Sequence, residues 1–324
     1  MMTSHIKTPL PSKQPTIYRE KKYANVIDAI GNTPLVEIDL GTEATLLAKL
    51  EFLNPGGSIK DRSARYMIED AEQKGLLQPG GTLIDASSGN QGIATAMIGA
   101  YKGYKVIITV SEKISKEKMD TLKAYGAEVV VCPCTDTLED PNSYHSRALA
   151  LQKKIPNSFM PNQYFNVANA WGHYHSLGPE IWSQTNGTVT HYFAAAGTGG
   201  HSTGAGRYLK EKNPNIKVIA LDSATSWRST NGCPQPYKLE GIGIDFESPV
   251  FDKAVIDEIV GVHDDDAIAM LKHMARKHGL LLGTSSGAVV YAAKEYAKNL
   301  SSDAVIVMAL GDSGRAYLTK GFYD

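Results

Sequence analysis

The sequence predicts an α/β protein made of two three-layer units, each with a mostly parallel sheet between helices. Strand-like and helix-like segments alternate almost without a break from about residue 33 to residue 310, and this order is typical of parallel sheets covered by helices. Polar, glycine-rich stretches follow several of the strand-like segments, and such sheets bind ligands at the carboxyl ends of their strands. A chain of 324 residues is long enough for two units of ordinary size.

The composition excludes several classes of protein. Apolar residues make up 42% and charged residues 21% of the chain, which is typical of a globular protein with a substantial core. The net charge of −1 gives no attraction to nucleic acid or to an anionic membrane surface, so neither is expected as a partner. Cys132, Cys134 and Cys233 are too few for a disulfide framework. We expect free thiols and, since no signal peptide or apolar span is recognisable, a cytoplasmic protein.

The first half of the chain begins with a segment unlike the rest. Residues 1–22 are polar and contain proline, so we expect a mobile tail, followed by a short amphipathic helix over residues 23–30 that stops at Gly31. Beyond it, short apolar runs predict strands, and segments with apolar residues on one helical face predict helices. The strands expected are residues 33–38, 46–50, 82–86, 105–110 and 128–132, and the helices are residues 59–74, 91–102, 116–125 and 143–154.

The second half of the chain repeats the alternation, with one long interruption. The helices expected there are residues 168–185, 203–212, 265–278 and 286–299, and the strands are residues 191–196, 217–221, 255–260 and 304–310. Residues 222–253 follow neither pattern and are too long for a plain connection, so we expect this segment to have a functional role.

Residues 46–62 are the stretch on which the functional prediction rests. An apolar strand runs into an Asn-Pro-Gly-Gly loop at residues 54–57, and a helical pattern follows. Lys60 falls in the first turn of this helix, where the positive end of the helix dipole disfavours another cation. The pKa of its ammonium group should therefore be lowered, which favours the neutral amine that forms a Schiff base.

A second strand end carries Gly197-Thr198-Gly199-Gly200-His201 and opens a helix. Glycines let the backbone close around an anion, and the amides and dipole of a helix start stabilise its charge. No Gly-Lys-Ser/Thr follows, so the loop is not a nucleotide-binding P-loop. Such a loop can hold a phosphate group, and the alternative for a single glycine-rich turn is a purely structural one.

A third strand end carries Ser87-Ser88-Gly89-Asn90-Gln91, again at a helix start. Hydroxyl groups and backbone amides in this position suit the carboxylate of a small substrate. The alternative is an ordinary helix cap rich in serine and glycine. The histidines and carboxylates of the chain show no metal-site spacing, so no metal is expected.

Together, in this order along the chain, these motifs resemble those of the pyridoxal-phosphate (PLP) enzymes of fold type II, the tryptophan-synthase-β group. The sequence is similar to the cysteine synthase and cystathionine β-synthase branch of that group from about residue 23 to the C-terminus. The resemblance implies a homodimer with the cofactor between the two domains of each chain. The smaller domain would be residues 46–165, and the larger domain would be residues 23–45 plus 166–324.

The resemblance also implies contacts to the cofactor. Lys60 would hold PLP in a Schiff base, Asn90 would bind the ring hydroxyl, and Ser285 would face the pyridine nitrogen. The loop of residues 197–201 would hold the phosphate. A neutral hydroxyl at the pyridine nitrogen makes the ring a weaker electron sink than a carboxylate would, which suits elimination and replacement at Cβ.

For the substrate, the resemblance implies a carboxylate site made of Ser87, Ser88, Gly89, Gln91 and Gln163, with Gly241 in a loop that closes over it. Several positions depart from the family pattern, among them Gly311, where a proline is often seen. Gln91 and His201 replace threonines, and Ile244 stands where the cystathionine synthase branch has tyrosine. Beside a phosphate dianion, the pKa of His201 should be raised.

The implied activity is β-replacement on serine or an activated serine by a thiol. Sulfide would give cysteine and homocysteine would give cystathionine, both through an aminoacrylate. O-acetylserine is favoured because acetate leaves unaided, whereas hydroxide needs a proton that Ile244 cannot supply.

Two alternatives stay open. One is a siderophore-pathway synthase that adds the amine of glutamate to an O-phosphoserine-derived intermediate. The other is a non-catalytic binding protein with the PLP fold, against which the presence of Lys60, Asn90 and Ser285 together argues.

Overall fold

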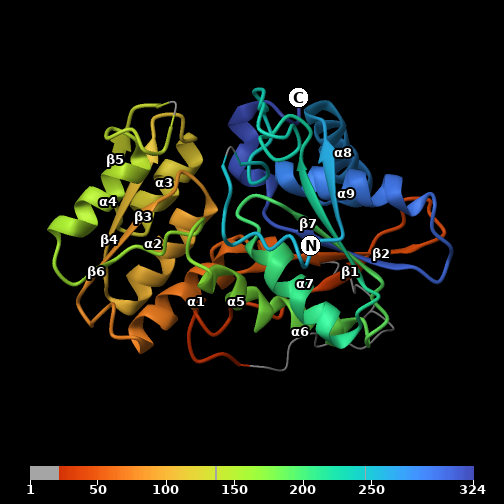
Figure 1. Ribbon diagram of the computed structural model, residues 1–324, viewed down its shortest axis with the longest axis horizontal. Coiled ribbons are helices and arrows are strands. Elements are labelled where there is room, and N and C mark those ends of the chain that lie inside the picture. Colours follow the sequence, from red (N-terminus) through yellow and green to blue (C-terminus); the bar gives the residue numbers. More distant parts are fainter. Residues whose placement is uncertain (1–21, 136, 245) are drawn as a thin grey trace, which may run out of the picture.

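The computed structural model describes residues 22–135, 137–244 and 246–324 and shows two sheets side by side, each between helices (Figure 1). The predicted tail at residues 1–22 lies outside the described residues, apart from Lys22. The predicted α/β class with two three-layer units is confirmed, because helices pack on both faces of each sheet.

The larger sheet has six strands within the described residues. Their order is β1 (Leu35–Glu37), β2 (Thr45–Leu50), β10 (Val305–Leu310), β7 (His191–Ala195), β8 (Lys217–Ser223) and β9 (Glu258–Val262). β1 is antiparallel to β2, and the other neighbours are parallel. The helices on one face are α8 (Asp264–His278) and α9 (Thr284–Ala297), and those on the other are α6 (Leu177–Gln184) and α7 (Gly200–Lys212).

The smaller sheet has four parallel strands within the described residues, in the order β5 (Glu128–Cys132), β4 (Lys105–Ser111), β3 (Thr82–Ala86) and β6 (Ser158–Phe159). The helices on one face are α1 (Lys60–Gln73), α2 (Asn90–Lys102) and α3 (Lys116–Ala124), and α4 (Tyr144–Lys154) covers the other. A short helix, α5 (Ala168–Tyr174), packs against both α1 and α7 and so joins the two units.

The structure moves the predicted domain boundary at residue 46. The strand that begins there, β2, pairs with β10 in the larger sheet, with Leu46 opposite Ile306. The smaller sheet starts only at β3. An apolar run predicts a buried strand, but it carries no information about which of two sheets the strand joins.

Two predicted helices differ in the structure. Residues 23–30 form turns instead of a helix, since so short a segment has little helical stability of its own; Ile27 and Ile30 are nevertheless buried against the smaller unit. The helix predicted over residues 168–185 is divided into α5 and α6. Pro179 explains the break, because its ring would clash with the carbonyl group four residues earlier in a continuous helix.

Three short elements were not predicted. They are β6 and the two 3₁₀ helices η1 (Glu51–Leu53) and η2 (Gly314–Lys320). Each is too short for a hydrophobic period to appear in the sequence. The element η1 turns the chain directly after β2, just before the loop that leads to Lys60.

Candidate active site

Lys60 is the first residue of α1, at the turn from loop to helix that the sequence predicts. The backbone before it is tied to the end of β10, since the amide of Ile59 donates to Gly311 O at 2.8 Å and Ser58 forms a bridge with Asp312. Burial lowers the pKa of the Lys60 ammonium group from 10.5 to about 8, and the charge of Asp312 opposes this shift. The predicted direction is confirmed, although burial is its first cause. A sizeable fraction of the amine is therefore neutral at weakly alkaline pH.

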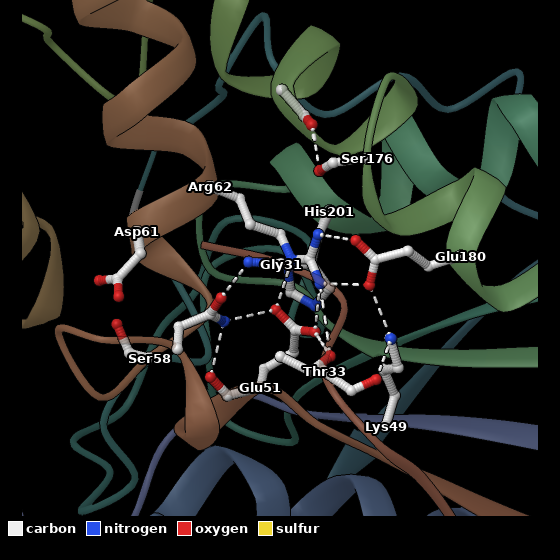
Figure 2. Close-up of polar contacts among 12 residues, drawn as sticks. Gly31, Thr33, Lys49, Glu51, Ser58, Asp61, Arg62, Ser176, Glu180 and His201 are labelled. Atoms are coloured by element: carbon white, nitrogen blue, oxygen red, sulfur yellow. Dashed lines mark hydrogen bonds and ion pairs between the residues drawn. The ribbon is translucent and has the colours of Figure 1, made fainter. Parts of the chain in front are cut away.

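A buried cluster of charged side chains, the Arg62 cluster, holds the start of α1 in place (Figure 2). The Arg62 guanidinium donates to both carboxylate oxygens of Glu51, at 2.7 and 2.9 Å. It also donates to both oxygens of Glu180, at 2.7 and 2.8 Å. These two-pronged bonds join α1 to η1 and α6, and they have the planar geometry in which a buried arginine binds carboxylates best.

Two further side chains that belong to the Arg62 cluster are Lys49 and Asn54. Lys49, on β2 and fully buried, donates to Glu180 at 2.7 Å. Asn54, in the loop before Lys60, donates to Glu51 Oε2 at 3.0 Å. The loop and the helix that present Lys60 are therefore fixed by a network that spans both units of the fold.

Lys60 opens onto a cavity of about 320 Å³, the Lys60 cavity, whose lining comes from both units. The predicted site residues found in this lining are Lys60, Ser87, Ser88, Gly89, Asn90, Gln91, Gln163, Gly197, Thr198 and Gly241. The predicted residues outside it are Gly199, Gly200, His201 and Ser285. Residues 237 and 239–243 also line the cavity, which supports the functional role expected for the long irregular segment.

The glycine-rich loop after β7 has the backbone that an anion site needs. Gly199 has a φ of +84°, in the left-handed region, and α7 begins at the next residue, Gly200. Neither position has space for a side chain: a Cβ on Gly199 would lie 2.7 Å from Phe251, and one on Gly200 would lie 2.0 Å from Asn169 Oδ1. The first amides of α7 have no carbonyl partner one turn earlier. The loop therefore fits a phosphate group held by backbone donors.

His201 lies in the first turn of α7 and is not part of the lining of the Lys60 cavity. Its side chain is buried, and its ring packs against that of His173 with the centroids 5.8 Å apart. Burial lowers the pKa of His201 to about 3, and the charge of Lys60 adds to this shift. In the protein by itself the pKa of His201 is thus lowered, because the imidazole lies in the interior where its charged form is poorly solvated; the raised pKa expected beside a phosphate dianion stays a prediction.

The serine-rich loop between β3 and α2 lines the Lys60 cavity. Ser88 Oγ accepts from the amide of Ser111 at 2.8 Å, which ties the loop to β4. The side chain of Gln91 is buried; it accepts from Ser63 on α1 at 3.1 Å and donates to Thr95 at 3.4 Å. Because these partners occupy the Gln91 amide group, we expect the backbone of this residue, and not its side chain, to face a substrate carboxylate.

Ser285, near the start of α9, lies next to Gly241, and Gly241 lines the Lys60 cavity. Gly241 has a φ of +78°, and a Cβ at this position would lie 3.3 Å from Ser285 Oγ. The Thr284 hydroxyl accepts from the amide of Glu240 at 2.8 Å and donates to its carbonyl at 3.0 Å, which fixes the loop beside Ser285. The missing side chain of Gly241 leaves space next to the serine hydroxyl, and this fits the planar ring of a cofactor.

Asn90 begins a chain of polar contacts. The residues that follow it in this chain are not among the predicted site residues. The Asn90 amide donates to Asp312 Oδ2 at 2.7 Å, and Tyr317 donates to the same oxygen. The Lys118 ammonium lies 4.5 Å from the centre of the Tyr317 ring and pairs with Glu240 at 2.5 Å. Asn90 and Asp312 are 222 residues apart, so no local pattern signals this pairing.

In the ranges 22–135, 137–244 and 246–324, no three His, Cys, Asp or Glu side chains are grouped so that they could hold a metal ion. Among the helices of that part of the chain, none has both the length and the apolar character that crossing a membrane requires. The three cysteines are free thiols, as predicted, with Cys132 buried and Cys134 and Cys233 exposed.

Known families and proteins resemble this chain over most of its length. The family model described as "Pyridoxal-phosphate dependent enzyme" matches residues 26–312. A cystathionine beta-synthase from Apis mellifera is 44% identical over 305 residues, which are 91% of this chain and 60% of that protein. The chain therefore spans less than two thirds of the length of this curated relative.

Other relatives match from end to end. A probable cysteine synthase from Bacillus subtilis (strain 168) is 42% identical over 310 residues, which are 94% of this chain and 99% of that protein. Among solved structures, the O-acetylserine dependent cystathionine beta-synthase from Helicobacter pylori is 36% identical with a TM-score of 0.87. That match covers 94% of this chain and 100% of the other. The similarity thus extends to sequence and fold together.

Proposed function

The chain belongs to the family of pyridoxal-phosphate-dependent enzymes, in the cysteine synthase and cystathionine β-synthase branch, and from this premise we propose that it catalyses β-replacement on O-acetylserine by a thiol. PLP, when bound, withdraws electrons from Cα so that a substituent on Cβ can leave. The observation that carries the proposal is the amine of Lys60, which has a pKa lowered to about 8 and opens onto a cavity lined by the serine-rich and glycine-rich loops.

Each part of the Lys60 cavity has a task that suits its chemistry. The glycine-rich loop and the first turn of α7 would hold the phosphate of PLP, and Ser285 would offer a neutral hydroxyl to the ring nitrogen. The hydroxyls and amides of residues 87–90 would hold the α-carboxylate of the substrate at the start of α2. Lys60 would take the proton from Cα, since a general base is most effective when its pKa is near the working pH.

Two of the phenols that line the cavity, Tyr144 and Tyr317, are poor proton donors, which favours an activated serine. Burial raises the pKa of the Tyr144 and Tyr317 phenols, and carboxylates near each add to this, so both phenols give up a proton reluctantly. Hydroxide leaving from serine needs a proton, because the pKa of water is about 15.7, whereas acetate is the base of an acid with a pKa of about 4. Ile244 lines a neighbouring cavity and not this one. An ester of serine is therefore the substrate that fits.

The test combines O-acetylserine, O-phosphoserine and serine with sulfide and with homocysteine, and follows the products and initial rates. We expect O-acetylserine to react fastest and serine at least about tenfold more slowly, which corresponds to about 1.4 kcal/mol in the barrier. Serine reacting as fast as O-acetylserine would contradict the leaving-group argument. Product from O-phosphoserine and the amine of glutamate alone would support the siderophore-type alternative, and no product from any pair would overturn β-replacement.

The remaining expectations concern the assembly and the cell. We expect a cytoplasmic homodimer, because the resemblance to the cysteine synthase branch implies one. Light scattering on the purified holoenzyme at two concentrations measures the mass in solution. A mass that corresponds to one chain at both concentrations would contradict the dimer.

A further inference from the structure

The irregular segment of residues 222–253 contacts the glycine-rich loop through residues outside the lining of the Lys60 cavity. Arg228, whose side chain is only 7% exposed, donates to the carbonyl oxygen of Ala196 at 2.8 Å. Ala196 directly precedes Gly197, the first residue of the loop. The Arg228 guanidinium is therefore anchored on the residue at which the loop begins.

The surroundings of Arg228 fix the direction of its guanidinium group. Asp222, fully buried near the end of β8, lies 3.4 Å from Nη1, and its carboxylate accepts from the Ser226 hydroxyl at 2.6 Å. The guanidinium carbon lies 4.2 Å from the centre of the Phe251 ring, which is a favourable position for a cation over an aromatic face. The Ala196 carbonyl is closer to Nη1 than the carboxylate is. The short hydrogen bond of Arg228 is thus the one to the loop.

Phe251 connects the same arginine to a later residue of the loop. A Cβ added to Gly199 would lie 2.7 Å from Phe251 Cβ, so the Phe251 side chain packs directly against this glycine. Arg228 lies over the Phe251 ring and binds the carbonyl of Ala196. The residue before the loop and the glycine at the start of α7 are therefore held by two neighbouring side chains.

The peptide that joins Ala196 to Gly197 is the one on which Arg228 acts. In a planar trans peptide, the carbonyl oxygen and the amide hydrogen point in opposite directions. The amide of Gly197 therefore points away from Arg228, and Gly197 lines the Lys60 cavity. A hydrogen bond from a cation to the carbonyl also polarises the peptide, which makes its N–H group a stronger donor. This peptide is thus oriented and polarised for an anion on its amide side.

We propose that Arg228 is a positioning residue for the phosphate group of PLP, because it orients and polarises the Gly197 amide, which would donate to this phosphate alongside the first amides of α7. Arg228 acts through the loop and is not itself a ligand of the phosphate. The inference rests on the proposed function only in that PLP occupies the Lys60 cavity with its phosphate at the glycine-rich loop. It holds for any leaving group and any nucleophile. If Arg228 only balanced the charge of Asp222, its loss would weaken the fold and leave phosphate recognition unchanged.

The first test compares PLP with pyridoxal, which has the same ring and aldehyde but no phosphate. Each is titrated into the cofactor-free protein, and the visible absorbance of the bound compound gives its dissociation constant. In Arg228→Met the dissociation constant for PLP should rise about tenfold, as for the loss of a hydrogen bond to a charged group. The dissociation constant for pyridoxal should not change. Arg228→Lys keeps a charged donor and should recover most of the affinity for PLP.

Two further variants separate the contact to Ala196 from the pairing with Asp222. Asp222→Asn removes the negative charge and leaves Arg228 with its carbonyl acceptor, so the affinity for PLP should stay close to that of the natural protein. Arg228→Met combined with Asp222→Asn leaves no unpaired carboxylate in the interior. This double variant should lose affinity for PLP as Arg228→Met does, and it serves as the test if the single variant folds poorly.

The matched control is Arg207→Met. Arg207, on α7, also pairs with an aspartate, Asp252, and also lies over an aromatic ring, that of Trp171. It differs in its place, about two turns beyond the start of the helix. This variant should leave the dissociation constants of PLP and of pyridoxal unchanged.

The second test reads the phosphate itself by phosphorus NMR of the holoenzyme. A phosphate with strong donors keeps its second negative charge to lower pH, and the second pKa of a phosphate ester is about 6 without them. The resonance of bound PLP should therefore begin to titrate at a higher pH in Arg228→Met than in the natural protein. In Arg207→Met it should titrate as in the natural protein.

The outcomes separate this inference from the function on which it rests. The inference is overturned if Arg228→Met and the double variant weaken PLP and pyridoxal by the same factor, or if neither compound is affected. It is also overturned if Asp222→Asn loses as much affinity for PLP as Arg228→Met does. None of these results affects β-replacement, which is measured on the natural protein. A natural protein that binds PLP and forms no product from any pair of substrates overturns the proposed function instead.

Discussion

Lys60 and Arg62 lie two residues apart at the start of α1, yet their surroundings are opposite. Arg62 is buried among two carboxylates, and each of these accepts two of its hydrogen bonds (Figure 2). Lys60 faces a cavity, and the nearest charge that stabilises its ammonium form, Asp312, does not offset the effect of burial on its pKa. The first turn of α1 therefore carries two cations. The charge of Arg62 is balanced by carboxylates, and that of Lys60 is not.

The difference teaches how rigidity and reactivity can come from the same short segment. A balanced buried charge holds its partners in place, because removing one leaves the others unpaired in the interior. An unbalanced buried amine is easily deprotonated, which is what a base or a nucleophile needs. The Arg62 cluster thus positions Lys60 without quenching its chemistry. The following predictions test the two sides separately.

The largest effect is expected on the reactive side. Lys60→Ala should lower turnover of O-acetylserine by more than roughly 10³-fold, because it removes both the covalent attachment of PLP and the base at Cα. Product formation and the visible absorbance of PLP measure the loss, and far-UV circular dichroism checks that the fold is intact. Lys74→Ala is the control, since the side chain of Lys74 lies exposed just beyond the last residue of α1. More than trace turnover in Lys60→Ala would make the central assignment wrong.

The next effect is expected on the balanced side, and it concerns stability. Arg62→Met should lower the free energy of unfolding by about 3–5 kcal/mol, because Glu51 and Glu180 would lose their main partner while buried. Urea unfolding of the cofactor-free protein measures it. Arg65→Met, one turn further along, is the control; its ion pairs are partly exposed, and such pairs contribute about 0–1 kcal/mol. Equal destabilisation by both variants would contradict a special role of the Arg62 cluster.

A third prediction connects the two sides through pH. The pKa of Lys60 is lowered from 10.5 to about 8 in the folded protein, so between these values the unfolded chain binds more protons, and stability rises with pH. Lys60→Met should therefore be more stable than the natural cofactor-free protein below about pH 8, by about 2 kcal/mol after allowing for partial contact with solvent. This advantage should shrink as the pH rises towards about 10.5. An advantage that stays constant over that window would show that the lysine is not held at a lowered pKa.

The reactive side could be predicted from the sequence to a large extent, and the balanced side could not. The turn that carries Lys60, the glycine-rich loop and the serine-rich loop are local patterns at strand ends, and the structure places all three around one cavity. Arg62 and Glu180 are separated by 118 residues, and a single sequence contains no sign of such a pairing. The sheet to which β2 belongs was unpredictable for the same reason.

Side-chain direction was the other limit. The periodicity of α7 places His201 in the first turn of a helix, but it does not say whether the imidazole faces an anion or the interior. The same holds for Gln91, whose amide group binds Ser63 and Thr95 instead of facing the cavity. The break between α5 and α6 differs from these cases, because Pro179 is a local signal for it in the sequence.

The smallest effect is expected at His201, on α7. The prediction tests whether its imidazole is a neutral, buried group or a charged group that contacts the phosphate. Its pKa is lowered to about 3 by burial and by the charge of Lys60, so the imidazole stays neutral between about pH 6 and pH 9. PLP affinity should therefore have the same pH dependence in the natural protein and in His201→Thr, as titrations across that range would show. Because the pKa of His201 is lower in the folded chain than in the unfolded chain, the unfolded chain binds more protons than the folded chain below about pH 6.5. The stability of the fold therefore falls as the pH falls.

His201→Thr should remove part of that fall, by about 1 kcal/mol at pH 5.5. The control is His263→Thr, since His263 is exposed to solvent. A loss of PLP affinity with rising pH that disappears in His201→Thr would instead mean that His201 is charged and contacts the phosphate. Such a result would assign His201 a direct role in binding the cofactor. A neutral His201 leaves the backbone amides of α7 as the principal phosphate donors, and it is the outcome that the burial of its ring favours.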